Sequence, residues 1–326
     1  MSDRQEPLYT EKNNCQDCYK CIKECPVKSI KIEDTSASIR YEYCTYCGHC
    51  ITICPAKAKK IRDDSQEIIT ALQNKEKLII SLAPSYISEF PTVGEETFVA
   101  AAKEMGFFGV SETALGAEKV SEATKAWLDK QDKGVFISSC CTAAVHYVCK
   151  YYPEKKHLLV PIDTPMVAHG KMLKKQYPGC KVVFVGPCIA KRKEARREDL
   201  EGKVDFVLTY EEVHAILGGM NIELGEANVH PVDCASRRSA HGFAENGGVT
   251  AAVKELVAGK IDFTTLQIAG LNKKNVALLK AYGKTGKAPA QFIEVMVCDG
   301  GCISGPSVHT AYGDGKKTFD AELKKR

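Results

Sequence analysis

The chain has 326 residues, enough for two domains or three small ones, and 44% of them are hydrophobic. Its formal net charge of +4 counts every thiol as neutral, so it does not indicate a nucleic-acid partner. No run approaches about 18 apolar residues, and the polar start has no apolar run behind it, so neither a membrane span nor a signal peptide is predicted. Sixteen cysteines in a chain of this length and helical patterning are typical of metal ligands rather than disulfides. We therefore expect a metalloprotein of the reducing, anaerobic cytoplasm.

Two similar cysteine runs lie in the first third of the chain. Residues 15–25 read Cys-x-x-Cys-x-x-Cys-x-x-x-Cys before Pro26, and residues 44–54 repeat this pattern before Pro55. Two-residue gaps let a tight loop wrap one face of a cubane cluster, and the proline ends the loop. A pair of zinc knuckles is the alternative. Zinc sites, however, take four ligands from paired Cys-x-x-Cys units, without a third cysteine followed by Cys-Pro.

The two runs resemble those of the bacterial two-cluster ferredoxins, and the match covers about residues 10–62. In that family three cysteines of each run bind one [4Fe–4S] cluster and the fourth binds the other cluster. The resemblance therefore implies two clusters with crossed ligand sets. The first set is Cys15, Cys18, Cys21 and Cys54, and the second set is Cys44, Cys47, Cys50 and Cys25. We expect a small α+β ferredoxin domain over residues 1–65, which carries electrons to a redox partner such as another ferredoxin.

After a polar linker at residues 63–76, short apolar runs alternate with segments of helical periodicity. Strands are predicted at residues 78–83, 134–138, 181–185, 204–209, 263–268 and 292–297. Helices are predicted at residues 95–105, 142–152, 210–217, 249–258 and 273–280. This alternation predicts an α/β domain with mainly parallel sheets over residues 66–326.

Cysteines stand just after three of the predicted strands. They are Cys140 and Cys141, then Cys188, and last Cys298, which Cys302 follows. Ligands of open α/β sheets bind at the carboxyl ends of the strands, so these three segments are expected to converge on one buried pocket. Four thiolates are enough for one cubane cluster, and the fifth thiol is then free to carry protons.

The surroundings of these cysteines resemble the three motifs of the [FeFe]-hydrogenase catalytic domain. They read Ser-Ser-Cys-Cys-Thr at 138–142, Gly-Pro-Cys at 186–188 with Lys191 and Glu194 behind it, and Glu-x-Met-x-Cys-x-Gly-Gly-Cys at 294–302. All three motifs occur in the family's order. With the ferredoxin runs ahead of them, the resemblance covers nearly the whole chain.

The resemblance implies an H-cluster, which joins a [4Fe–4S] cluster to a diiron subcluster with CO, CN⁻ and azadithiolate ligands. The cubane ligands would be Cys141, Cys188, Cys298 and Cys302, and Cys302 would also bridge to the subcluster. A single thiolate holds the subcluster, so its cyanides need hydrogen bonds, and Lys191 would donate a charge-assisted one. The remaining pocket residues would be Ala83, Pro84, Ser85 and Met296.

The same resemblance implies reversible H₂ oxidation and proton reduction. Cys140, beside the ligand Cys141, would pass protons outward. Electrons would leave through the cubane and then through the ferredoxin clusters. Hydrogenase maturation proteins would be further partners, because they supply the diiron subcluster.

Several positions depart from the family pattern. Thr142 replaces a proline, and Gly186 replaces a methionine, which is expected to loosen the packing around the subcluster. Glu122 aligns with the first of two glutamates on the usual proton route, but Lys125 stands in place of the second. The chain also ends shortly after Cys302. These departures resemble the sensory branch of the family, so we expect slow turnover, H₂ sensing and a separate signalling protein.

Two other functions stay open. Eukaryotic relatives of the hydrogenases bind cubanes without a diiron site and serve as iron–sulfur assembly factors, although their N-terminal cluster set is smaller than the eight cysteines here. The second alternative is an electron-transfer protein whose H-cluster domain is inactive.

Residues outside the motifs receive simpler interpretations. Three cysteines are expected to be small buried hydrophobic residues, namely Cys149, Cys180 and Cys234. The histidines, His214 among them, show no ligand spacing and are assigned no role. Glu194 is as compatible with an exposed helix charge as with the family motif. The charged segment 322–326 is expected to be a solvated end.

Overall fold

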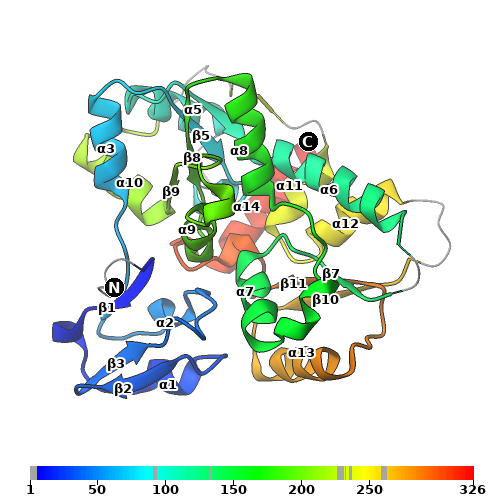
Figure 1. Ribbon diagram of the computed structural model, residues 1–326. Coiled ribbons are helices and arrows are strands. Elements are labelled where there is room, and N and C mark those ends of the chain that lie inside the picture. Colours follow the sequence, from blue (N-terminus) through cyan, green and yellow to red (C-terminus); the bar gives the residue numbers. More distant parts are fainter. Residues whose placement is uncertain are drawn as a thin grey trace.

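The computed structural model describes residues 6–90, 94–131, 134–225, 231, 233–234, 237–257 and 263–326. Figure 1 shows a small N-terminal unit beside a larger α/β part. The small unit has two antiparallel strand pairs, and the larger part has a four-stranded and a three-stranded sheet whose strands all pair in parallel. The predicted α/β fold with mainly parallel sheets is confirmed.

The N-terminal unit repeats one local pattern in both cysteine runs. Each run contains a short helix that begins after a residue in the left-handed conformation, Tyr19 at φ +56° and Gly48 at φ +78°. The unit consists of β1 Leu8–Thr10, η2 Lys12–Asn14, α1 Lys20–Glu24, β2 Ile30–Glu33, β3 Ser36–Ile39, α2 His49–Thr52 and β4 Lys59–Ile61. Strand β1 pairs with β4, and β2 pairs with β3, so the repeat brings the two ends of the unit together.

The four-stranded sheet has the order β6-β5-β8-β9. Its strands are β5 Leu78–Leu82, β6 Gly109–Glu112, β8 Lys181–Val185 and β9 Phe206–Leu208. Its main covering helices are α3 Ser65–Gln73, α5 Glu95–Glu104, α8 Pro165–Gln176 and α10 Tyr210–Gly219. Ile80 and Leu82 pack in the core with α3, α5 and α10, whereas Ile79 and Val182 pack with Leu173 of α8 on the other face. Because both faces are buried, β5 and β8 are mostly apolar, and the polar Ser81 of β5 is hydrogen-bonded to Thr113.

The three-stranded sheet has the order β10-β11-β7. Its strands are β7 Phe136–Ile137, β10 Thr265–Ala269 and β11 Phe292–Met296. Its covering helices are α6 Ala114–Leu128, α7 Thr142–Tyr151, α12 Gly248–Leu256 and α13 Lys273–Thr285. Ile293 packs with the core of α7 and α13, and Phe292 packs with the core of α6 and α12. This sheet is therefore also covered on both faces.

The predicted elements of the α/β part are all present, with ends shifted by a few residues. Ala258, at the end of one predicted helix, lies outside the described residues. The expected linker at 63–76 contains helix α3, and the prediction missed β6, α8 and the C-terminal helix α14 (Tyr312–Lys325). Helix α8 was detectable, because Thr164 is its N-cap and Pro165 its first residue. The other elements are α4 Tyr86–Glu89, η3 Pro153–Leu158, α9 Ile189–Ala195, η4 Glu198–Leu200, α11 Arg238–His241, η5 Gly242–Ala244, η6 Cys302–Ser304 and α14 Tyr312–Lys325.

The C-terminal arginine is held in the fold, so the prediction of a solvated end is wrong for it. The guanidinium of Arg326 donates to Glu112 at 2.6 Å and to Glu95 at 3.1 Å. Its side chain is only 17% exposed. Helix α14, which Arg326 follows, also packs against α4. Among the described residues, no helix is long and apolar enough to span a membrane.

A buried arginine joins the segment between the two units to the four-stranded sheet. The side chain of Arg192 on α9 is 1% exposed and forms ion pairs with Glu212 and with Asp64. It also donates to the backbone carbonyl of Arg62. Glu212 accepts in addition from the backbone N–H of Asp64 at 2.7 Å. This network places the segment at residues 62–64 against α9 and α10.

We expect Arg192→Met to lower the free energy of unfolding by about 3–5 kcal/mol, because the buried carboxylate of Glu212 loses its cation. Asp64 keeps its ion pair with Arg62 in this variant. Arg196→Met is the matched control, since Arg196 reaches the same Asp64 at 3.7 Å with a side chain that is 48% exposed. Its effect should stay below about 1 kcal/mol. Anaerobic urea unfolding, followed by circular dichroism, measures the loss of stability in both variants. Equal unfolding midpoints for the two variants would contradict the structural role given to Arg192.

Candidate metal centres

Two cavities in the N-terminal unit are lined by the crossed cysteine sets. Cys15, Cys18, Cys21 and Cys54 line one of them. The other is lined by Cys25, Cys44, Cys47 and Cys50. The structure thus brings together the two groups that the resemblance implied, each with three cysteines from one run and one from the other.

The loop geometry of the two runs matches. The fourth cysteine of each run accepts a hydrogen bond from a backbone N–H four residues later. Ser29 donates to Cys25 Sγ and Ala58 donates to Cys54 Sγ, both at 3.3 Å. Backbone N–H groups aimed at sulfur stabilise a thiolate, as an iron–sulfur site requires.

Burial and mutual proximity raise the pKa of several of these thiols, which favours their protonated form in the absence of metal. Burial, together with the neighbouring Cys44 and Cys25, raises the pKa of Cys47 to about 12. Burial also raises the pKa of Cys21, with contributions from Cys54 and Cys15. Since metal ligands must be deprotonated, binding would have to displace these protons. The all-sulfur donor sets fit [4Fe–4S] clusters.

The α/β part brings the four remaining motif cysteines together. Cys141 is the N-cap of α7 and Cys188 the N-cap of α9, while Cys298 follows β11 and Cys302 begins η6. Burial raises the pKa of Cys298, and Cys188, Cys302 and Cys141 each raise it further. Burial also raises the pKa of Cys188 to about 11, although Lys191 opposes this. Four partly buried sulfur donors at one place fit a cubane cluster.

Two glycines make the last motif possible. Gly300 and Gly301 have φ angles of +93° and +87°. Residues with a side chain rarely adopt this backbone conformation. A Cβ on Gly301 would lie 2.7 Å from the carbonyl oxygen of Ala244, and one on Gly300 would lie 2.4 Å from the ring of Tyr312. The Cys-x-Gly-Gly-Cys segment therefore turns tightly between neighbouring chain segments, which positions Cys302 close to Cys298.

A buried ion pair lies beside these cysteines. The ammonium of Lys191 donates to Glu194 Oε2 at 2.7 Å, and both side chains are at most 10% exposed. Thr142 donates to the same oxygen at 2.8 Å, and Thr164 donates to it at 3.2 Å. Burial disfavours the charged Lys191, but Glu194 and Cys188 outweigh this and raise its pKa. Glu194 is thus buried rather than an exposed helix charge, and Thr142, at the family's proline position, is one of its donors.

Cys140 and Met296 lie in the same region as these thiols. Cys140 packs against the core cluster of α6 and α12, and its thiol is close enough to Cys302 to raise the pKa of that residue, after burial and Cys188 and Cys141. Burial raises the pKa of Cys140 itself to about 12. Met296 ends β11 and is buried.

The segment from Ala83 to Ser85 follows β5 and leads into α4. Ala83 and Ser85 are buried, Pro84 is partly exposed, and the hydroxyl of Ser85 lies 2.7 Å from that of Tyr210. Gly186 lies nearby. A Cβ on it would be 2.9 Å from the Phe184 ring and 3.0 Å from Cβ of Ala83. Phe184 and Ala83 thus leave little space for a side chain at Gly186, and its effect on the packing around the subcluster stays a prediction.

The outer candidates of the proton route form surface ion pairs. Glu122 pairs with Lys119 at 3.0 Å and with Arg237 at 2.9 Å, and Lys125 pairs with Asp129 at 2.6 Å. Both residues lie on α6, which also packs against the region of Cys140. The structure therefore gives neither residue an inward hydrogen-bond partner among the described residues.

The cysteines outside the motifs differ in burial. Cys180 is buried as predicted, and Cys149 is partly buried. Cys234 is exposed, so its prediction was wrong, because it lies near the acidic side chains Glu95 and Glu112 rather than in a core. Sequence reasoning also missed a cluster of Glu89, His214 and His309. These three residues are far apart in the chain and have no local spacing that could have revealed them.

The N-terminal unit contacts the α/β part through the second cysteine run. A Cβ on Gly48 would lie 2.4 Å from Cβ of Pro306, four residues after Cys302. A groove between the two units is lined by residues of both, Cys47 and Cys298 among them. The second cysteine set is thus adjacent to the cysteines of the α/β part.

Comparison with known proteins agrees with this architecture. Residues 76–306 match the family described as "Iron only hydrogenase large subunit, C-terminal domain". Residues 7–55 match the 4Fe-4S dicluster domain. The chain therefore belongs to the iron-only hydrogenase family and carries a ferredoxin-like domain in front, as the motifs predicted.

Relatives in sequence include both hydrogenases and assembly factors. Iron hydrogenase 1 of Clostridium pasteurianum is 27% identical over 290 residues, which cover 72% of this chain and 50% of that protein. The periplasmic [Fe] hydrogenase large subunit of Nitratidesulfovibrio vulgaris is 27% identical over 282 residues, which cover 70% of this chain and 67% of that protein. The cytosolic Fe-S cluster assembly factor NAR1 of Kluyveromyces lactis is 33% identical over 93 residues, which cover 28% of this chain and 20% of that protein. The chain spans about half the length of the first of these relatives.

Solved structures show the same fold. An [FeFe]-hydrogenase from Chlamydomonas reinhardtii superposes with a TM-score of 0.60 at 18% identity, covering 79% of this chain and 88% of its own. A second [FeFe]-hydrogenase structure, solved in a study of oxygen inactivation, gives 0.61 at 16% identity, covering 78% and 88%. At this identity the likeness concerns the fold alone.

The crossed arrangement of the N-terminal cysteines predicts opposite results for two double variants. Cys15→Ala/Cys54→Ala changes one set only and should cost about four iron atoms per chain, whereas Cys15→Ala/Cys25→Ala changes both sets and should cost up to about eight. Iron analysis and electron paramagnetic resonance of the reduced protein measure the loss. If each run held its own cluster, the two variants would exchange their results.

Proposed function

We propose that this protein is a slow, H₂-sensing [FeFe]-hydrogenase that interconverts H₂ with protons and electrons at an H-cluster. The observation that carries the proposal is the position of the Cys140 thiol and the Lys191 ammonium beside four partly buried cysteines. A cubane alone needs only the four thiolates. A further thiol and a buried cation at the same place suit a site that also handles protons and anionic ligands.

The proposal assigns the chain's cofactors to its two units. Residues 1–65 form a ferredoxin-like domain, and residues 66–326 form the H-cluster domain. The eight N-terminal cysteines bind two [4Fe–4S] clusters in crossed sets. The H-cluster is held by Cys141, Cys188, Cys298 and Cys302. When bound, its diiron subcluster supplies the site at which H₂ is split or formed.

The residues of the pocket then have distinct roles. Lys191 has three donors, of which Glu194 engages one, so it can also donate to a cyanide ligand. Met296, Ala83, Pro84 and Ser85 line the pocket as largely buried walls that exclude water. Cys140 accepts and releases the proton. Electrons pass to the second cysteine set, which is the one adjacent to Cys298, and then outward.

Slow turnover is supported by the side chains beyond Cys140. Glu122 and Lys125 are both engaged in surface ion pairs on α6. Neither has an inward partner among the described residues, so the two-glutamate proton route of the family is not reproduced by this pair. A protein that senses H₂ needs to bind it but has no need of rapid proton exchange. A turnover rate equal to that of the fast hydrogenases, measured on matured protein, would contradict the sensory role.

A second function is favoured by one observation. Part of the chain is 33% identical to the assembly factor NAR1 of Kluyveromyces lactis. The alternative is therefore a non-catalytic iron–sulfur assembly factor, or an electron-transfer protein, that lacks the diiron subcluster. The full set of eight N-terminal cysteines favours electron transfer in support of catalysis.

The chemistry also suggests the setting. All sixteen cysteines are free thiols in the structure, which suits a reducing cytoplasm. Maturation proteins would deliver the diiron subcluster, a ferredoxin would exchange electrons, and a separate signalling protein would receive the H₂ signal.

Infrared spectroscopy distinguishes the hydrogenase from both alternatives. We expect bands of metal-bound CO and CN⁻ after anaerobic maturation with the diiron precursor, because the pocket should hold the complete H-cluster. The control is the same protein reconstituted with iron and sulfide only, which should show no such bands. If the bands stay absent although all [4Fe–4S] clusters are present, the hydrogenase proposal fails.

Cys140→Ala should preserve those infrared bands and reduce H₂ turnover by roughly 10²–10⁴-fold, the range of a lost proton-transfer group. Cys149→Ala is the control, because Cys149 is partly buried on α7 outside the cluster of motif cysteines. Hydrogen evolution with a reduced dye and H₂ oxidation should both decline. Unchanged turnover in Cys140→Ala would remove this residue from the proton path.

A further inference from the structure

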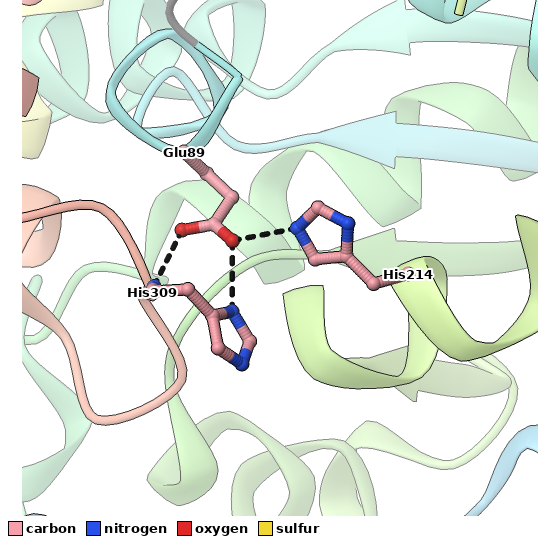
Figure 2. Close-up of side chains that lie close together, drawn as sticks. All are labelled: Glu89, His214 and His309. Atoms are coloured by element: carbon pink, nitrogen blue, oxygen red, sulfur yellow. Dashed lines mark hydrogen bonds and ion pairs between the residues drawn. The ribbon is translucent and has the colours of Figure 1, made fainter. Parts of the chain in front are cut away.

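Three residues from distant parts of the chain meet outside the cysteine sites. Figure 2 shows the carboxylate of Glu89 between the imidazole rings of His214 and His309. His214 Nε2 lies 2.7 Å from Glu89 Oε1, and His309 Nδ1 lies 2.8 Å from the same oxygen. The backbone N–H of His309 donates to the other carboxylate oxygen at 2.7 Å. One ligand atom from each residue lies within 4.8 Å of the other two.

The carboxylate is buried, whereas the two rings form a partly open rim. The side chain of Glu89 is 0% exposed, and those of His214 and His309 are 43% and 53% exposed. Burial favours the neutral acid, but hydrogen bonds from His214 and His309 outweigh it and lower the pKa of Glu89. Among the described residues, no lysine or arginine forms an ion pair with Glu89. A buried carboxylate is therefore held by two imidazoles and one backbone N–H, and none of these groups is a permanent cation.

The other acidic cluster of the chain provides a contrast. Glu95 and Glu112 come together near Cys234, but there the guanidinium of Arg326 already pairs with both carboxylates. That cluster has a resident cation and needs no metal ion. At Glu89 the same electrostatic requirement is left to an external cation, because buried charges are paired or coordinate metals.

We propose that Glu89, His214 and His309 form a binding site for a divalent transition-metal ion of the zinc type, separate from the iron–sulfur centres. Two imidazole nitrogens and one carboxylate oxygen are a donor set that Zn²⁺ favours, with a fourth position left for water. Ligation at about 2.0–2.1 Å would move the rings roughly 0.6 Å away from the carboxylate. Both rings are half exposed, so they have room to do this.

The site would join three segments next to the proposed H-cluster pocket. Glu89 ends α4, His214 lies on α10, and His309 follows the segment that begins with Cys302. Ser85 and Tyr210 stand four residues before Glu89 and His214, and their hydroxyls are 2.7 Å apart. Helices α4 and α10 thus already meet at two successive levels, and the segment of His309 already reaches α4 through its hydrogen bonds to Glu89. A metal ion would tie all three segments to one centre. The site does not depend on the proposed hydrogenase activity.

Zinc binding to the complete protein tests the proposal. Anaerobically purified protein with its iron–sulfur clusters is mixed with one equivalent of Zn²⁺ and desalted, and zinc content and zinc K-edge absorption are measured. We expect about one zinc per chain, with nitrogen and oxygen neighbours at about 2.0–2.1 Å, including imidazole. Zinc bound to sulfur at about 2.3 Å, or no retained zinc, would overturn the site.

Single variants make the assignment specific. His214→Ala and His309→Ala should each weaken zinc binding by at least roughly tenfold, since even the loss of an outer partner of a ligand costs that much. Both histidines are half exposed, so the variants should fold. His157→Ala is the control, because this exposed histidine contacts only a nearby backbone carbonyl, and its zinc affinity should equal that of the wild type. Unchanged affinity in the His214 and His309 variants would overturn the proposal.

Discussion

Parallel pairing of the strands decides where the motif cysteines of the α/β part stand. Phe292 and Ile293 of β11 pair in parallel with Phe136 and Ile137 of β7. The two segments that follow these strands therefore leave the sheet at the same edge. Leu82 and Val185 are likewise partners in the other sheet. Because parallel strands end together, the segments after them have to meet there. A change of register would move the motif cysteines apart and leave the pocket without a complete ligand set.

The charged groups that lie in the interior also hold the parts of the molecule in place. Lys191 pairs with Glu194 beside the cysteines, and Arg192, the next residue, pairs with Glu212 and reaches the segment between the two units. Consecutive residues of one short helix thus serve the pocket and the domain junction. Arg326 holds the C-terminal helix in the same way. Since burying a charge is costly unless it is paired, each of these pairs also restricts how its segments can be arranged.

The N-terminal unit and the α/β part meet where electron transfer would need them to. Gly48 has no room for a side chain against Pro306, so the second cysteine run approaches the segment after Cys302 closely. The first cysteine set lies in a separate cavity of the same unit. This order suits a chain of clusters from the proposed pocket through the second set to the first, with a partner at its end.

The sequence by itself determined the features that depend on local spacing. The two cysteine runs predicted two clusters because a short loop places three nearby cysteines around one cluster, whereas the crossed fourth ligands were implied by the family resemblance. Apolar runs predicted the parallel strands because buried strands are apolar on both faces. Tertiary structure decided what depends on side chains distant in the chain. Thr142 donates to Glu194, Phe184 and Ala83 lie close to Gly186, and Arg326 pairs with Glu112. The cluster of Glu89, His214 and His309 belongs here too, because no period or motif links three residues that only the packing of α4, α10 and the C-terminal segment brings together.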